Sequence, residues 1–223
     1  TQRGRGRGLL GGSNDGSPFS NNIQFITIQS QGNSIDFGDL FEQRSRASSY
    51  ASSTRGIWGG GMSAPTNKTD TIDFVTIATT GNATNFGNLT VSRKFCSGTS
   101  SETRGLSVGG NESPPSAPYT SVTTIDFTTI ASAGDAQSFG DLLAKRSGLG
   151  ALSSTVRAVF AGGYSNGSPA AATNDITFVT IATTGDSADF GDLTVNKRYL
   201  NGVSSNTRGV FCSGSNPAQK NTI

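Results

Sequence analysis

The sequence predicts an all-β fold, a β-propeller of four-stranded antiparallel blades with about 50 residues each. One observation is a recurring tetrapeptide, Phe-Gly-Asp/Asn-Leu, whose copies start 49, 53 and 51 residues apart at Phe37, Phe86, Phe139 and Phe190. A second is composition, because 30 Gly and only 33% hydrophobic residues in 223 suit many turns and short strands. A third is a set of landmarks whose spacing is constant from repeat to repeat.

The landmarks are two phenylalanines and two basic residues. In the first repeat Phe25 is followed by Phe37 after 12 residues, by Arg44 after 7 more and by Arg55 after 11 more, and the later repeats keep these intervals. Constant spacing predicts at least four blades that superimpose in a single domain, 1–223. The repeats cover about 7–54, 55–103, 104–156 and 157–207, with a partial one at 208–223. The chain ends inside a repeat, so we expect a segment of a longer propeller, or a ring completed by residues outside this chain.

Strands are named a to d from the propeller axis outward. Runs rich in Ile, Val, Thr and Phe predict strand c at 23–28, 72–77, 125–130 and 176–181. A turn then leads to strand d, which contains Phe-Gly-Asp/Asn-Leu. Stretches of small residues at 47–53, 97–101, 148–154 and 202–205 predict strand a, because bulky side chains would collide near the axis. Segments that begin at the last arginine of each repeat predict strand b.

All length variation falls between strands b and c. These connections, 13–20, 63–70, 111–120 and 165–173, are rich in Pro, Gly and Asn, which is typical of surface loops. Strands alternate in direction within a blade, so the b–c loops and the d–a connections are expected on one face. Variation would then be confined to that face.

Composition excludes several function classes. A net charge of +2 is too small to indicate nucleic acid binding, and no apolar run approaches the roughly 20 residues that span a bilayer. The chain has no His, which removes the commonest general base and metal ligand. Its two cysteines, Cys96 and Cys212, are expected to be free thiols. We therefore expect no catalytic residues, no metal and no cofactor.

The double glycines that end strand b, such as Gly60-Gly61 and Gly109-Gly110, together with the paired basic landmarks, resemble the kelch repeat. Kelch blades usually carry a Tyr and a Trp after the double Gly, whereas the single Trp here, Trp58, precedes it. Blocks 71–81, 189–195 and 208–211 look more like the degenerate kelch-like arrays of tailed phages, especially marine ones. The resemblance covers nearly the whole chain, implies a propeller, and does not by itself identify a function.

Two groups of residues are candidates for roles. The repeated phenylalanines and arginines are predicted to join neighbouring blades. The arginines lie at fixed offsets from Asp39, Asp141 and Asp192, which predicts repeated internal pairing, including charge-assisted bonds to carbonyls, although a ring of arginines could also bind an anionic glycan. This group is Phe37, Phe86, Phe139, Phe190, Arg55, Arg104, Arg157 and Arg208. Residues in or beside the variable loops are the predicted binding residues, namely Trp58, Met62, Tyr119, Tyr164, Asn111 and Asn166.

The function expected from these features is that of a non-enzymatic structural or adhesion propeller of a virus particle, a phage tail, fibre or capsid-surface protein. Its loops would recognise a host-surface glycan or protein, or other virion proteins, within a larger oligomeric assembly. The alternative is a secreted lectin with one sugar site in each blade, which the unequal loops weaken. A copper oxidase is disfavoured because its metal ligands are histidines. A cytosolic kelch interaction module would be expected to carry a partner domain.

Overall fold

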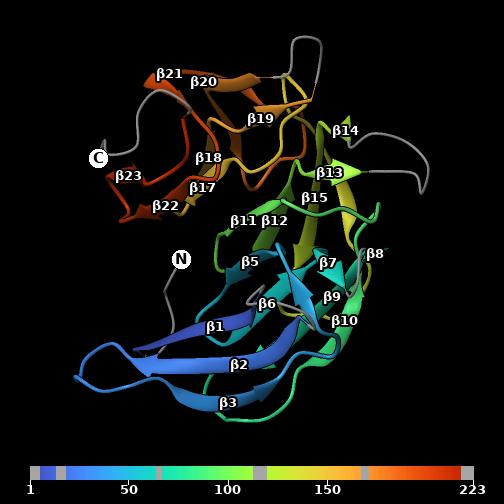
Figure 1. Ribbon diagram of the computed structural model, residues 1–223, viewed down its shortest axis with the longest axis vertical. Helices are drawn as coiled ribbons and strands as arrows, with labels where there is room; N and C mark the ends of the chain where they lie inside the picture. The colour runs from blue at the N-terminus through green and yellow to red at the C-terminus, as the bar shows by residue number, and fades with distance from the viewer. Residues whose placement is uncertain (1–5, 14–18, 64–66, 113–119, 167–170, 217–223) are drawn as a thin grey trace.

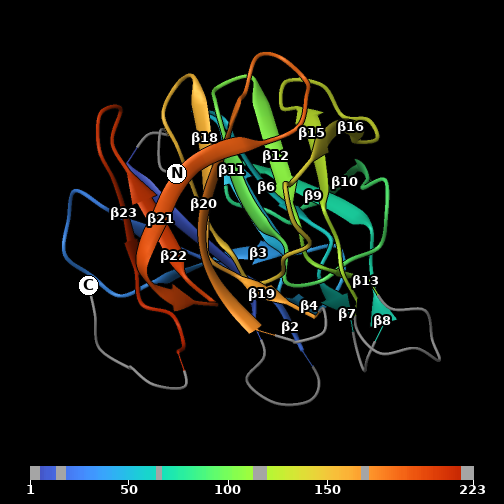
Figure 2. The same cartoon turned by 90° about the horizontal axis from the view of Figure 1, so that it is seen from above.

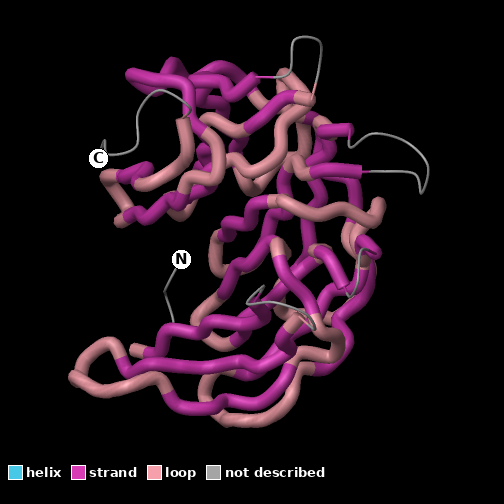
Figure 3. Tube along the Cα trace, viewed as in Figure 1, coloured by secondary structure: helices cyan, strands magenta, loops and turns pink. Residues whose placement is uncertain are grey.

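The computed structural model describes residues 6–13, 19–63, 67–112, 120–166 and 171–216. Within these ranges every regular element is a β-strand (Figure 3), as the composition predicts. No helix long and apolar enough to cross a bilayer occurs in the described residues.

The strands form antiparallel sheets that follow one another around an axis. Blade 1 contains β1 (Arg7–Ser13), β2 (Ser20–Thr27) and β3 (Ile35–Asp39). Blade 2 contains β5 (Ser48–Ala51), β6 (Arg55–Gly59), β9 (Thr71–Thr76) and β10 (Thr84–Asn88). Blade 3 contains β11 (Ser97–Ser100), β12 (Arg104–Val108), β15 (Thr124–Thr129) and β16 (Gln137–Asp141). Blade 4 contains β17 (Gly150–Ser153), β18 (Arg157–Ala161), β20 (Ala171–Thr180) and β21 (Ala188–Lys197). The C-terminal hairpin contains β22 (Asn201–Ser204) and β23 (Gly209–Cys212).

The blades form an open arc in which blade 1 and the C-terminal hairpin lie at the two ends (Figure 1). The strand order β5-β6-β9-β10 in blade 2 is the predicted a-b-c-d order, and blades 3 and 4 repeat it. Blade 1 holds b, c and d, and the C-terminal hairpin holds a and b. The fold class predicted from the sequence is therefore confirmed.

The small-residue strands are innermost, as predicted. β5, β11, β17 and β22 lie next to one another around the axis. They approach so closely that a Cβ on Gly98 would lie 2.4 Å from the carbonyl oxygen of Ser49, and one on Gly202 equally close to that of Ala151. Small side chains are thus a steric requirement of strand a.

Short strands at one end of the molecule tie each d–a connection to a b–c loop (Figure 2). These strands are β4 (Arg44–Ser45), β7 (Met62–Ser63), β8 (Asn67–Lys68), β13 (Asn111–Glu112), β14 (Thr120–Ser121) and β19 (Tyr164–Ser165). Ser45 pairs with Met62, and at equivalent positions Lys94 pairs with Asn111, Ser147 with Tyr164 and Arg198 with Ser215. We call this end the loop face.

Each blade packs on the next through the Phe-Gly-Asp/Asn motif of strand d. Phe25 and Phe37 meet edge to face with centroids 5.9 Å apart, and the other blades hold the same pair. Phe37, Phe86 and Phe139 are only 2–3% exposed, because strand c and the c–d turn of the following blade cover them. We call this contact between two consecutive blades a joint. In the joint between blades 1 and 2 the covering residues are Val75 and Ala83.

The glycine of the motif allows the backbone of strand d to approach the c–d turn of the next blade closely. Gly81 N–H donates to the Phe37 carbonyl at 2.7 Å, and Ala83 N–H donates to the Asp39 carbonyl at 2.7 Å. A Cβ on Gly38 would lie 2.5 Å from the carbonyl carbon and oxygen of Gly81. The joints between blades 2 and 3 and between blades 3 and 4 repeat these bonds, so the glycine is required for blades to dock.

The strand b arginines also reach the next blade. Arg55 stacks over Phe74 at 4.6 Å and donates from Nη1 to the Ile130 carbonyl of blade 3 at 2.8 Å. Arg7 and Arg104 make the equivalent bonds to Ile77 and Ile181. Arg157 stacks over Phe178, while the Arg208 side chain is exposed. Arg7, Arg55 and Arg104 thus make charge-assisted bonds to carbonyls, one of the predicted forms of internal pairing. In the described residues no ion pair joins an arginine to Asp39, Asp141 or Asp192.

Candidate binding site on the loop face

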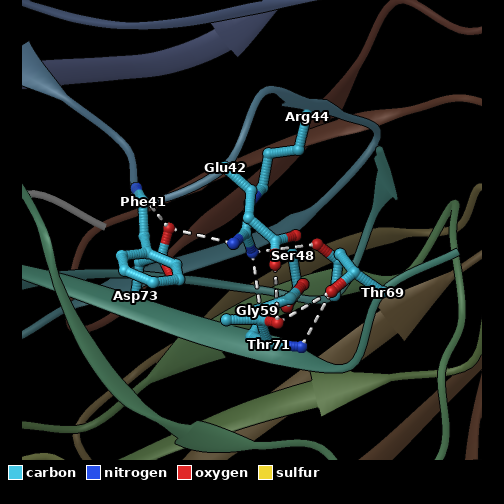
Figure 4. A network of polar contacts seen from close by, with 9 residues as sticks. Phe41, Glu42, Arg44, Ser48, Gly59, Thr69, Thr71 and Asp73 are labelled. Carbon is cyan, nitrogen blue, oxygen red and sulfur yellow. Dashed lines mark hydrogen bonds and ion pairs between the residues drawn. The ribbon is translucent and has the colours of Figure 1, made fainter. Parts of the chain in front are cut away.

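A row of buried arginines lies beneath the loop face. Each arginine belongs to a d–a connection. Arg44 donates from Nη1 to the carbonyls of Gly60 and Thr71, and its Nη2 lies 2.9 Å from an Asp73 carboxylate oxygen (Figure 4). Phe41 N–H donates to the same carboxylate at 3.1 Å. Burial raises the pKa of Asp73, and the Arg44 charge opposes that effect. Arg93 forms the equivalent ion pair with Asp126 in blade 3.

Blade 4 departs from this pattern. Arg146 donates from Nη2 to the Thr177 hydroxyl at 2.6 Å, at the position where blades 2 and 3 have Asp73 and Asp126. Its Nη1 donates to the carbonyls of Asp175 and Gly162. Arg146 is 1% exposed, and burial lowers its pKa. These three arginines anchor the start of each b–c loop, so they stabilise the scaffold beneath the loop face.

A cluster of aromatic and basic side chains lies above this row. The Arg46 guanidinium is 4.5 Å from the Phe95 ring centroid, and the Phe95 and Tyr199 rings are 5.5 Å apart. Arg198 lies over both Tyr199 and Tyr164, at 5.3 and 4.7 Å. We call Arg46, Phe95, Tyr164, Arg198 and Tyr199 the axial cluster. Arg46 is exposed and Tyr199 is 46% exposed, so the cluster is open to a partner.

The cluster is held by a ladder of main-chain hydrogen bonds across blades. Phe95 N–H donates to the Arg46 carbonyl at 3.0 Å, Gly148 to Phe95 at 2.9 Å, and Tyr199 to Gly148 at 2.6 Å. All four residues occupy one repeat position and are left-handed, with φ between 58° and 60°. This conformation is unfavourable for Arg, Phe and Tyr, and it is maintained here by the ladder. Gly148 also makes room, because a Cβ there would lie 2.6 Å from the Tyr199 ring.

A polar cavity of about 260 Å³ lies beside the cluster along the axis. Its lining includes Ala47, Cys96 and Leu200, the residues that directly follow Arg46, Phe95 and Tyr199. Burial raises the pKa of the Cys96 thiol, so it stays protonated at neutral pH and is a poor nucleophile. No group of three or more His, Cys, Asp or Glu that could hold a metal ion occurs in the described ranges.

Trp58, a predicted binding residue, is instead part of the core. It is 5% exposed and packs between blades 1 and 2 with Ile23 and Phe25, and a Cβ on Gly11 would lie 2.9 Å from its ring. Strand b alternates between its two neighbouring blades, and Trp58 points back toward blade 1. The sequence does not reveal this direction, because the other blades have different residue types at the position.

The remaining predicted binding residues have different surroundings. Tyr164 belongs to the axial cluster, and Met62 borders it, with Sδ 3.5 Å from Lys94 Nζ and 3.9 Å from Arg46 Nη1. Asn111 is buried, and its Oδ1 accepts from the Ser121 hydroxyl at 3.1 Å, so it holds its own loop. Asn166 is half-buried at the edge of a variable loop. Tyr119 lies outside the described residues.

Sequence reasoning missed Arg46, Phe95, Arg198 and Tyr199 because it searched the b–c loops for variation. A usable signal was present two residues after each buried basic landmark, where Arg, Phe, Gly and Tyr replace one another in a connection of constant length. The cluster presents aromatic faces and guanidinium donors beside a polar cavity, whose lining includes the residues that follow Arg46, Phe95 and Tyr199. That combination suits binding of a sugar ring or a protein loop.

No protein-family model matches the chain, and no curated protein sequence matches it. Among solved structures, the fold is similar to that of YjhT, a kelch-repeat β-propeller protein, with a TM-score of 0.78. The match covers 96% of this chain and 76% of the YjhT chain at 10% sequence identity. At that identity the likeness concerns the fold alone, which is that of a kelch-type propeller.

Proposed function

We propose that this protein is a non-catalytic adhesion propeller of a virus particle, and that its loop face binds a partner on the host surface. The axial cluster is the observation that carries the proposal. The cluster lies at the face where the variable loops leave the scaffold, with Arg46 and Tyr199 exposed and its other three members half-buried. Tyr and Arg are enriched in recognition sites. Placement on a virus particle is supported by the resemblance of the repeat to phage kelch-like arrays.

The cluster favours a single site over one site in each blade. The four equivalent positions hold Arg46, Phe95, Gly148 and Tyr199, so no two blades present the same group. A lectin with repeated sugar sites needs near-identical pockets, and these positions do not provide them. A partner bound across the axis would contact several blades at once.

The test is binding of the purified chain to host cells and to a glycan array. Tyr199→Ala and Arg46→Ala should each weaken attachment by about tenfold or more, as expected for the loss of a central aromatic or Arg contact. Phe41→Ala is the matched control, because Phe41 is a 63% exposed aromatic outside the cluster. Thermal unfolding of all three variants should match the parent chain.

Unchanged attachment of both cluster variants, with their thermal stability preserved, would refute the proposal. Binding to an array with several equivalent sites for each chain would instead support the lectin alternative. Titration calorimetry on the best array ligand separates these outcomes, because an axial site predicts a stoichiometry of one.

A further inference from the structure

The joint that links one blade to the next is left open on blade 4. Phe190 is 53% exposed, whereas its equivalents Phe37, Phe86 and Phe139 are 2–3% exposed. A Cβ on Gly191 would meet nothing within 4 Å, whereas one on Gly140 would lie 2.3 Å from the Gly185 carbonyl oxygen. The motif of blade 4 thus has the residues of a joint without the contacts of one.

The hydrogen-bonding groups of this joint are also available. In the three closed joints the carbonyls of the motif's Phe and Asp/Asn accept two N–H groups from the next c–d turn. No such bond is made to the carbonyls of Phe190 and Asp192 among the described residues. Arg157 stacks over Phe178 at 4.8 Å, and in the described residues it makes no equivalent of the Arg55 bond to the Ile130 carbonyl. We call Arg157, Phe178, Phe190, Gly191 and Asp192 the open joint.

Next to blade 4, the positions of strands a and b of a following blade are filled by the C-terminal hairpin. β22 and β23 of the C-terminal hairpin pack against β17, where strands a and b of a following blade belong. In the described residues β23 pairs with β22 alone, so its other edge lacks the strand c that β9 supplies to β6. Among the described residues, the positions of strands c and d of that following blade are therefore unfilled.

We propose that the open joint is a docking site for the c–d β-hairpin of a further blade of this repeat class. Its strand c would extend the hairpin along the free edge of β23 by β-strand addition. Its turn, of the type Gly-Asn/Asp-Ala/Ser, would donate two N–H groups to the carbonyls of Phe190 and Asp192. Its Val and Ile side chains would cover Phe178 and Phe190, as Val75 covers Phe25 and Phe37. This proposal is independent of the proposed function.

A second copy of the chain is disfavoured as the occupant. Every strand c in the described residues is already paired to its own strand b, including β2 of blade 1, which pairs with β1. If blade 1 of a second copy docked here, its β1 would compete with β23 for one position. The occupant is expected to be a hairpin that has no strand b of its own.

The probe is a fluorescent synthetic peptide of residues 71–89, which is the c–d hairpin of blade 2. We expect saturable one-to-one binding to the purified chain, measured by anisotropy. Phe190→Ser and Arg157→Gln should each weaken it by about tenfold or more. Phe41→Ser, at a similarly exposed phenylalanine, should leave it unchanged. A peptide with Ala83→Pro, which lacks one donating N–H, should bind more weakly.

An isolated two-stranded hairpin is marginally stable, so a tethered form provides a second measurement. Appending another copy of residues 71–89 after Ile223 should raise the melting temperature of the parent chain and not that of Phe190→Ser. The proposal is overturned if neither the peptide nor the tethered hairpin engages, or if Phe190→Ser has no effect on either. Light scattering should show a monomer, and self-association abolished by Phe190→Ser would overturn it in favour of a second copy.

Discussion

Arg93 Nη1 lies 2.9 Å from a carboxylate oxygen of Asp126, and both side chains are at most 1% exposed. The arginine belongs to the connection that leads into blade 3, and the aspartate to strand c of that blade. The pair therefore fixes the start of a blade to its outer half, just beneath the loop face. The Asp126 carboxylate also accepts the N–H and the hydroxyl of Thr90.

Breaking this pair should be costly. Asp126→Asn leaves Arg93 buried without a counter-charge, and we expect a loss of about 3–5 kcal/mol in the free energy of unfolding. Urea denaturation measures it. Asp36→Asn is the control, because Asp36 accepts an exposed hydrogen bond from Asn22 and its loss should change stability by less than about 0.5 kcal/mol. Equal effects of the two substitutions would contradict the role given to the pair.

Restoring the carboxylate in blade 4 should stabilise the protein. Thr177→Asp places an acceptor of full charge beside Arg146, whose pKa burial now lowers. We expect a gain of about 1–2 kcal/mol in the free energy of unfolding after the cost of burying the carboxylate. Calorimetric melting at neutral pH measures the gain, and a lower melting temperature than that of the parent chain would count against it.

The motif glycines should tolerate no side chain where a joint is closed. Gly140→Ala places a Cβ 2.3 Å from the Gly185 carbonyl oxygen, in a conformation of φ 151°. Blades 3 and 4 would have to separate, at a cost of about 2–4 kcal/mol. Gly32→Ala is the matched control, because a Cβ there meets nothing within 4 Å. Similar melting temperatures for the two variants would disprove the close approach.

Tyr50 should make stability depend on alkaline pH. Burial raises its pKa to about 12, and its hydroxyl lies 2.9 Å from that of Thr128 in blade 3. In the unfolded chain the Tyr50 hydroxyl ionises near pH 10. The contribution of Tyr50 to the free energy of unfolding is therefore complete below about pH 10 and is lost as pH rises toward 12. The loss amounts to about 2–3 kcal/mol. Tyr50→Phe should flatten the profile in that window, whereas Tyr199→Phe, at an exposed ring, should not.

Much of the fold could be predicted from the spacing of the repeats. Phe37, Gly38 and Arg55 recur at fixed intervals because each touches the neighbouring blade in the same way. The identity of ionic partners could not be read from the same spacing. Asp73 follows Arg44 by 29 residues across a variable loop, whereas Asp39, which lies nearby in the sequence, forms no ion pair in the described residues.

The candidate site was harder to predict than the fold. Tyr164 was identified because it is a tyrosine beside a variable loop. Its partner Arg198, and Tyr199 on the other side of Arg198, lie in a connection whose length does not vary. What brings them together is a left-handed turn repeated around the axis, which non-glycine residues adopt only when tertiary contacts maintain it. Trp58 was misplaced for a related reason, since the face of a strand depends on the neighbouring blade.

Residue-resolved hydrogen exchange is the most direct test of the joint on which this structure depends. The N–H groups of Gly81, Gly134 and Gly185 donate to the carbonyls of Phe37, Phe86 and Phe139, whereas Gly32, at the same repeat position in blade 1, makes no such bond among the described residues. We predict slow exchange at the first three and fast exchange at Gly32. Fast exchange at all four would contradict blades joined through this turn.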